Sequence, residues 1–314
     1  MKRKFFVFSI LMVMISSVSF AADLLSLVPY NAILVLDVNL EKISSQPILK
    51  ELYQNLLPTY DNGEFTGQFE KAGINPYKDF QNVMMFVTED EKFGLLAEGS
   101  FDTVTTYESV DNNEGLKQIC EIRSIGGLPA LYQEEMAQST ITLVDQRTIA
   151  LGDMAILEEI GKLYNEKEDG KSIKKHPNFV YMSNRLDFNK QIWGVGIGGK
   201  GWSSNVTTPK SGVDNIRMTI FDIDYGDKEF SLSVTALVAR NSELEGLVKS
   251  LVELVEGVKG FVATVPGMTK IVDKVEIVDD HSNMARIQLN MPIDQFNAAI
   301  SEVAGYVEQE EKQK

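Results

Sequence analysis

From residue 22 onward, short runs of β-branched and aliphatic residues alternate with longer stretches whose apolar residues recur at helical spacing. Residues 31–39 are of the first kind and predict a strand. The clearest helix is expected after residue 242. Ser242 and Glu245 have the spacing of a capping box, and the apolar residues from Leu244 to Val262 keep a helical period. Both element types are therefore expected in quantity.

The order of these elements repeats. Each half reads as strand, hairpin, helix, hairpin, helix, and residues 178–185 are expected to match the opening strand 31–39. The expected hairpins are residues 83–97 and 128–151 in the first half and residues 216–238 and 270–289 in the second. Hairpins that alternate with single helices favour antiparallel sheets. The predicted fold is therefore α+β, a tandem duplication with antiparallel sheets and helices packed on one face.

The domain organisation follows from this repeat. We expect a signal peptide at residues 1–21, a first α+β repeat at 22–170, a second repeat at 171–307 and a charged tail at 308–314. Residues 171–177 are basic and polar and are interpreted as the link between the repeats. The pattern leaves open whether the repeats form one sheet or two lobes.

The first 21 residues have the three parts of a secretory signal. Lys2, Arg3 and Lys4 are basic, residues 5–15 are apolar except for one serine, and small residues precede a cleavage site expected after Ala21. No cysteine lies near residue 22 and no second long apolar run follows, so neither a lipid anchor nor a transmembrane anchor is expected. The predicted location is the periplasm or the exterior, as a soluble protein.

Composition narrows the function classes. The net charge of −15 repels nucleic acid, so nucleic-acid binding is excluded. The 44% of hydrophobic residues is enough for a packed core. The single cysteine, Cys120, forbids an internal disulfide and is interpreted as a buried structural thiol, because no activating histidine is indicated near it.

Catalytic and metal-binding patterns are sparse. The only histidines are His176, in the expected link, and His281, in an expected turn, and neither belongs to a recognisable triad or metal motif. Asp222 and Asp224 alternate along an expected strand, so their side chains share one face. That pair could serve acid–base chemistry, but a polar sheet face is the preferred interpretation. No cofactor and no metal site is predicted.

The most unusual segment is residues 193–202, which holds both tryptophans and five glycines. Its glycines match nucleotide-loop patterns, but no strand–loop–helix unit surrounds them and no Ser or Thr follows Lys200. One interpretation is an exposed loop that presents Trp193 and Trp202 to a partner, with Gly196 and Gly199 giving it freedom. The other is that both indoles pack on the core.

Two segments resemble a known group of sequences. Residues 27–32 (LVPYNA) before a strand and residues 126–132 (GGLPALY) before a hairpin are similar to exported bacterial proteins of unknown function, which share an LVPxxA start and duplicated α+β repeats. This resemblance implies a duplicated fold and brings no activity.

The leading functional hypothesis is a non-catalytic exported envelope protein that binds or scaffolds an unidentified protein or envelope component. The alternatives are an exported hydrolase with dispersed carboxylates, tested first at Asp222 and Asp224, and a small-ligand carrier with a cavity between the two repeats.

Overall fold

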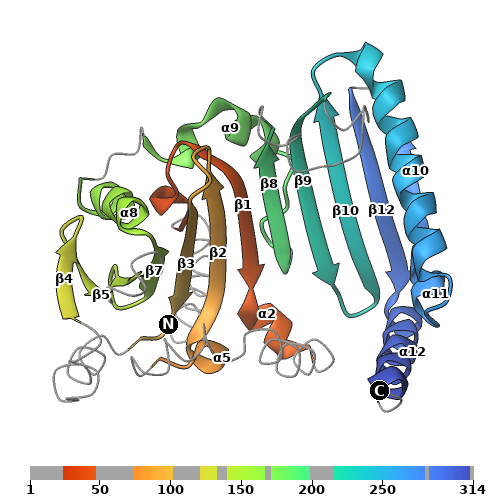
Figure 1. The fold of residues 1–314 in the computed structure, drawn as a ribbon, viewed down its shortest axis with the longest axis horizontal. Coiled ribbons are helices and arrows are strands. Elements are labelled where there is room, and N and C mark those ends of the chain that lie inside the picture. Colours follow the sequence, from red (N-terminus) through yellow and green to blue (C-terminus); the bar gives the residue numbers. More distant parts are fainter. Residues whose placement is uncertain are drawn as a thin grey trace, which may run out of the picture. The chain divides into compact units, whose positions relative to one another are not determined.

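The computed structural model describes residues 24–46, 74–101, 121–132, 140–166, 171–198, 215–279 and 283–311 (Figure 1). The chain divides into two compact units, Met1–Val180 (unit 1) and Tyr181–Lys314 (unit 2). Each unit combines helices with an antiparallel sheet, so the predicted α+β class is confirmed. Within the described ranges, no helix has the length and apolar character needed to cross a membrane.

The sheet of unit 1 is antiparallel throughout and has the strand order β1-β2-β3-β7-β6-β5-β4. Its strands are β1 (Ala32–Asn39), β2 (Phe80–Thr88), β3 (Phe93–Gly99), β4 (Glu121–Ile125), β5 (Leu128–Tyr132), β6 (Thr140–Leu143) and β7 (Thr148–Gly152). The helical elements are η1 (Leu25–Leu27), α2 (Leu40–Ser45), α5 (Pro76–Asp79), α8 (Met154–Glu166) and η4 (Ile173–Lys175). Cys120 lies outside the described residues, and so does the stretch 102–118, where the first repeat is expected to have the helix between its two hairpins.

Helix α8 begins at a side-chain cap, because the Asp153 carboxylate accepts the Ile156 amide N–H at 2.8 Å. The buried stripe of the helix consists of Ile156, Leu157, Ile160 and Leu163. Met154, at the start of the helix, is 38% exposed, because the face that packs inward begins two residues later, at Ile156.

The stretch read as a polar link is an integral part of unit 1. The Ser172 hydroxyl donates to the Leu25 carbonyl at 2.7 Å, and the Ile173 amide donates to the Val28 carbonyl at 2.9 Å. Ser172 and Ile173 are both buried. This segment therefore holds the residues before β1 in place.

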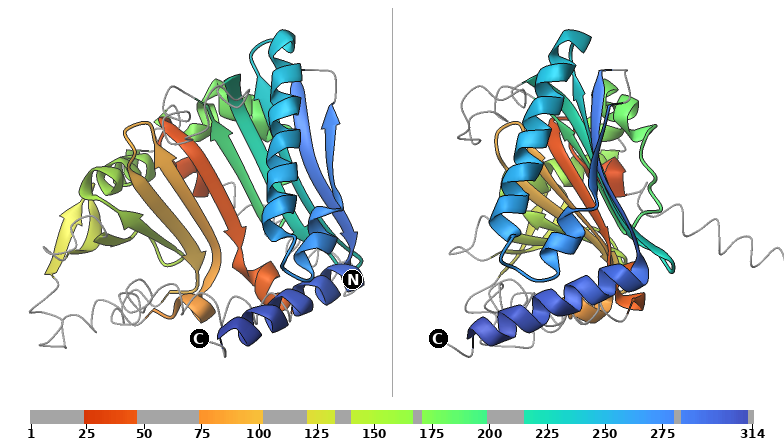
Figure 2. Two further views of the ribbon diagram at one scale, coloured as in Figure 1. Left: turned by 45° about the vertical axis from the view of Figure 1, so that its right-hand side comes forward. Right: turned by 90° about the vertical axis from the view of Figure 1, so that its right-hand side faces the viewer.

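The sheet of unit 2 is also antiparallel, with the order β8-β9-β10-β12-β11. Its strands are β8 (Ile192–Ile197), β9 (Ile216–Tyr225), β10 (Glu229–Val238), β11 (Val275–Asp279) and β12 (Met284–Pro292). Its helical elements are η6 (Asn241–Glu243), α10 (Leu244–Val262), α11 (Met268–Val272) and α12 (Ile293–Glu311). Figure 2 shows α10 running alongside these strands.

Two helices complete the core of unit 2. Leu247 and Leu251 of α10 pack with Val238 of β10 and Ala285 of β12 in one buried cluster. The Phe296 ring of α12 stacks on Phe230 of β10, with ring centroids 3.8 Å apart. These contacts bury one face of the sheet, as its alternating pattern requires.

Three local expectations for the second repeat are wrong. Residues 178–185 are not a strand, because α9 (Pro177–Ser183) occupies them, and proline is favoured at the first helical position. Residues 270–272 belong to α11, so the strand there starts only at Val275. The capping interaction before α10 lies two residues earlier than expected, since the Arg240 amide donates to the Glu243 carboxylate at 3.2 Å.

Candidate functional site

Unit 1 contains a cavity of about 300 Å³ beside the N-terminal end of β1. Its lining residues are Pro29, Tyr30, Asn31, Glu159, Lys162, Leu163 and Lys171. This volume falls at the small end of the range for sites that bind small molecules. The lining combines apolar surface with opposite charges, which is the composition expected of a site for a small polar ligand.

Backbone hydrogen bonds fix one wall of this cavity. The Tyr30 amide donates to the Lys171 carbonyl at 2.7 Å, and the Asn31 carbonyl accepts from the Glu89 amide at 3.0 Å. The opposite wall is a single turn of α8, where Glu159, Lys162 and Leu163 are three and four residues apart and so share a face. The cavity is therefore lined by helix α8 and by a segment that backbone hydrogen bonds hold in place.

Several polar side chains at the cavity have no internal partner. In the described part of the chain, the Asn31 amide group, the Glu159 carboxyl and the Lys162 ammonium make no hydrogen bond or ion pair. The Tyr30 hydroxyl is likewise unbonded there. Polar side chains that line a cavity and are not hydrogen-bonded to one another can bind a ligand.

The Glu159 carboxyl lies in an environment that disfavours its charge. Desolvation raises its pKa, and the neighbouring carboxylates of Asp90 and Asp153 raise it further, while Lys92 and Lys162 act in the opposite direction. Lys92 is already bound to Asp90, with Nζ 2.8 Å from Oδ2. Glu159 therefore forms no ion pair with either lysine.

His176 packs against Tyr30, one of the residues that line the cavity. The two ring centroids lie 4.8 Å apart, and the Nδ1 atom of His176 is buried without a hydrogen-bond partner among the described residues. Burial lowers the pKa of His176, while the charge of Glu89 opposes that shift. The imidazole is therefore held in its neutral form as a packing group.

The carboxylates predicted on one strand face of unit 2 do share that face. Asp222 and Asp224 lie in β9, opposite Ser233 and Ser231 of β10. The Asp224 carboxylate receives the Lys190 ammonium at 3.1 Å. Among the described residues Asp222 makes no hydrogen bond or ion pair, and its burial raises its pKa against the opposing charges of Lys190 and Arg286.

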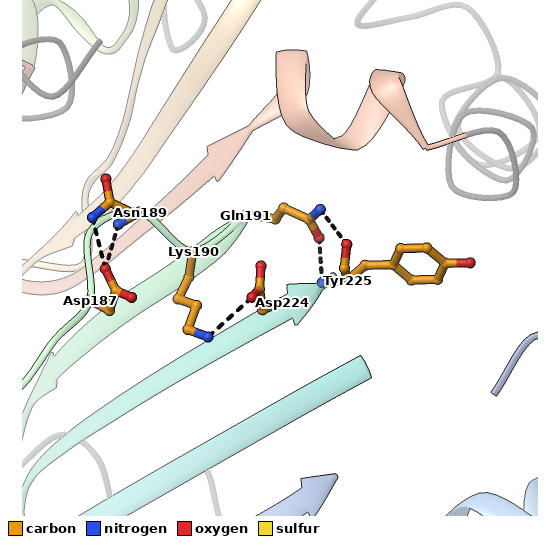
Figure 3. A network of polar contacts seen from close by, with 6 residues as sticks. All are labelled: Asp187, Asn189, Lys190, Gln191, Asp224 and Tyr225. Atoms are coloured by element: carbon orange, nitrogen blue, oxygen red, sulfur yellow. Dashed lines mark hydrogen bonds and ion pairs between the residues drawn. The ribbon is translucent and has the colours of Figure 1, made fainter. Parts of the chain in front are cut away.

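The start of β8 is anchored next to Asp224, as Figure 3 shows. The Gln191 side chain donates from Nε2 to the Tyr225 carbonyl at 2.9 Å and accepts the Tyr225 amide at 2.7 Å. The Asp187 carboxylate accepts both the backbone and the side-chain N–H of Asn189. Lys190 is thus held between two fixed neighbours, which keeps it beside Asp224.

The glycine-rich segment is only partly a loop. Trp193 and Gly196 lie within β8, and the Trp193 side chain is fully buried, with its ring edge-on to Phe188 at 4.9 Å. This indole is therefore not displayed to a partner. Gly199 and Trp202, with His281, lie outside the described residues. Within the described ranges, no three His, Cys, Asp or Glu side chains are grouped closely enough to hold a metal ion.

Sequence reasoning did not single out Glu159, Lys162 or Lys171. The three-residue spacing of Glu159 and Lys162 on a predicted helix was visible, but that spacing is common on solvated helix faces. Tyr30 and Asn31 did stand in the LVPYNA segment that the resemblance rests on.

Comparisons with known proteins give only distant similarity. No protein-family model matches the chain, and no curated protein matches it. Among solved structures the chain is similar to TP0453 in several crystal forms. Form I is 10% identical, with a TM-score of 0.49, and the match covers 89% of this chain and 96% of that chain. Form IV is also 10% identical over the same shares, with a TM-score of 0.48.

Proposed function

We propose that this chain is a non-catalytic exported protein that binds a small molecule in the unit 1 cavity. The observation that carries the proposal is the set of unbonded polar side chains, Asn31, Glu159 and Lys162, around one cavity of about 300 Å³. Export, with cleavage after Ala21 and a periplasmic or secreted location, is part of the proposal and rests on the basic, apolar and small-residue pattern of residues 1–21.

The ligand site proposed here is the cavity within unit 1. It takes the place of the cavity between the two repeats that the sequence offered as an alternative. The proposal keeps the tandem duplication, which the strand orders support. The orders β1-β2-β3-β7-β6 and β8-β9-β10-β12-β11 correspond strand for strand, and a helix follows β7 and β12 alike. The matched residues Leu151 and Leu289 pair with Leu95 and Leu232 of the corresponding strands β3 and β10.

The duplication also explains why only one unit would bind. When Leu151 is aligned with Leu289, Glu159 corresponds to Asn297 and Lys162 to Ile300. Asn297 accepts a hydrogen bond from the Tyr225 hydroxyl, so this position is satisfied internally in unit 2. The pair of unbonded charges is therefore particular to unit 1, and unit 2 is proposed as the scaffolding half.

A blocking substitution tests the binding proposal. Lys162→Trp places a large side chain at the cavity, and Lys249→Trp, at an exposed site on α10, is the matched control. The mature chain is screened with a metabolite mixture by native mass spectrometry and ligand-observed NMR. We expect a bound compound with the wild type and the control and none with Lys162→Trp. A compound held equally by all three proteins would contradict the proposal.

A hydrolase remains the second candidate, and Asp222 favours it. Its carboxyl is unbonded and its pKa is raised by burial, while the adjacent Asp224 is paired with Lys190. Two carboxyl groups in such unequal surroundings can divide into an acid and a base. Asp222→Asn and Asp224→Asn are assayed against ester, peptide and glycoside substrates. Activity that is lost in both variants would favour this candidate over the binding protein.

A further inference from the structure

The charges at the unit 1 cavity have opposite signs and form no ion pair with each other. Glu159 and Lys162 are three residues apart on α8 and both line the cavity, although the charge of Lys162 still acts on the Glu159 carboxyl. A ligand is therefore offered one anionic and one cationic group in the same small space.

We infer that the cavity takes a zwitterion of α-amino-acid type, whose ammonium group is bound by Glu159 and whose carboxylate is bound by Lys162. This inference rests on the proposed binding function and names its ligand class. Pro29 and Leu163 supply apolar surface for an aliphatic side chain. The Asn31 amide and the Tyr30 hydroxyl can hydrogen-bond either charged end.

Ligands with a single charge fit the same surroundings less well. A simple anion bound at Lys162 would lie near Glu159, with Asp90 and Asp153 close enough to act on that carboxyl. A simple cation bound at Glu159 would leave the Lys162 ammonium without a partner. An ammonium group at Glu159 would also favour the ionised carboxylate, whose formation desolvation disfavours.

Three probes with the same leucine side chain separate these cases. L-leucine carries both charges, N-acetyl-L-leucine carries only the carboxylate, and L-leucinamide carries only the ammonium. Isothermal titration calorimetry on the mature chain compares them. We expect L-leucine to bind about tenfold or more tightly than either analogue, because each analogue leaves one charged group of the protein unpaired.

Two variants test which residue binds the ammonium group of the ligand and which binds its carboxylate. Glu159→Gln should weaken L-leucine about tenfold without weakening N-acetyl-L-leucine, because that probe has no ammonium and is repelled by the carboxylate. Lys162→Gln should weaken L-leucine without weakening L-leucinamide, which has no carboxylate. Both residues are exposed, so the variants are expected to fold, and Glu158→Gln on the same helix is the control.

The outcomes distinguish this inference from the proposed function. Equal binding of L-leucine and N-acetyl-L-leucine would overturn the zwitterion in favour of an anion, and equal binding of L-leucinamide would overturn it in favour of a cation. Absence of L-leucine binding at about 1 mM also overturns it. In that case, a different compound displaced by Lys162→Trp would leave the binding function intact.

Discussion

The imidazole of His176 lies against the phenol ring of Tyr30, with ring centroids 4.8 Å apart and planes inclined at 56°. The two residues belong to segments far apart in the sequence, and the bond from the Tyr30 amide to the Lys171 carbonyl holds those segments together. The His176 carbonyl also accepts the Val180 amide at 2.9 Å, at the start of α9. His176 therefore joins the wall of the cavity to the end of unit 1.

The first prediction concerns the pH dependence of this contact. Burial lowers the pKa of His176 below its usual 6.5. As pH falls through that unfolded value, the unfolded chain takes up a proton before the folded chain does, so acidification lowers stability. His176→Phe keeps a ring against Tyr30 and removes this titration. We expect it to lose less stability than the wild type between pH 7.5 and about 5.5, measured by urea unfolding.

His281→Phe is the control for that experiment, since it removes the other histidine of the chain. If His281→Phe flattens the profile and His176→Phe does not, the assignment to His176 is wrong.

The second prediction concerns Glu159. Its pKa is raised, chiefly by desolvation, so the folded state binds its proton more tightly than the unfolded state does. Its contribution therefore favours folding at acid pH and is lost as pH rises through the folded pKa. Glu159→Gln should raise the urea midpoint slightly at pH 7 and leave it unchanged at about pH 3.5, below the unfolded value. A lowered midpoint at pH 7 would show that the carboxylate stabilises the fold.

Local patterns predict much of this fold. The strand expected at residues 31–39 is β1, the apolar period from Leu244 to Val262 is α10, and the hairpin expected at residues 216–238 is β9 and β10. Each of these depends on neighbouring residues alone, because side-chain periodicity reports directly which face is buried. The α+β class followed from such elements.

The predictions from the sequence fail where contacts beyond the local pattern determine the structure. Residues 178–185 are as apolar as a strand, but Pro177 begins a helix there. Trp193 lies in a glycine-rich sequence typical of a loop, yet pairing with Asp222 places it in β8. The cavity could not be predicted, because Tyr30, Lys162 and Lys171 meet only after residues 171–173 bond to the start of the chain's described part.

The third prediction uses two glycines in helices. Gly161 of α8 lies against the turn between β4 and β5, and a Cβ there would clash with the Gly126 carbonyl. Gly126 and Gly127 both have positive φ, as a tight hairpin turn requires, so this turn cannot easily move. Gly161→Ala should cost about 1–3 kcal/mol of unfolding free energy.

Gly246→Ala is the matched substitution, because a Cβ at that position in α10 meets nothing within 4 Å. It should raise the unfolding free energy by about 0.5–1 kcal/mol, since alanine loses less conformational entropy in a helix. Equal effects of the two variants in chemical denaturation would refute the close approach of α8 to the turn.

The fourth prediction concerns Trp193, whose side chain is fully buried and whose ring meets Phe188 at 4.9 Å. Its Nε1 atom has no hydrogen-bond partner among the described residues, so its contribution comes from packing alone. Trp193→Ala should therefore cost about 3–5 kcal/mol of unfolding free energy.

Fluorescence tests the same burial. The single-tryptophan variant Trp202→Phe should give blue-shifted emission that acrylamide quenches weakly, because the remaining indole is shielded from water. Trp193→Phe, which retains Trp202 alone, is the comparison, and strong quenching of Trp193 in the Trp202→Phe variant would contradict its buried place in β8.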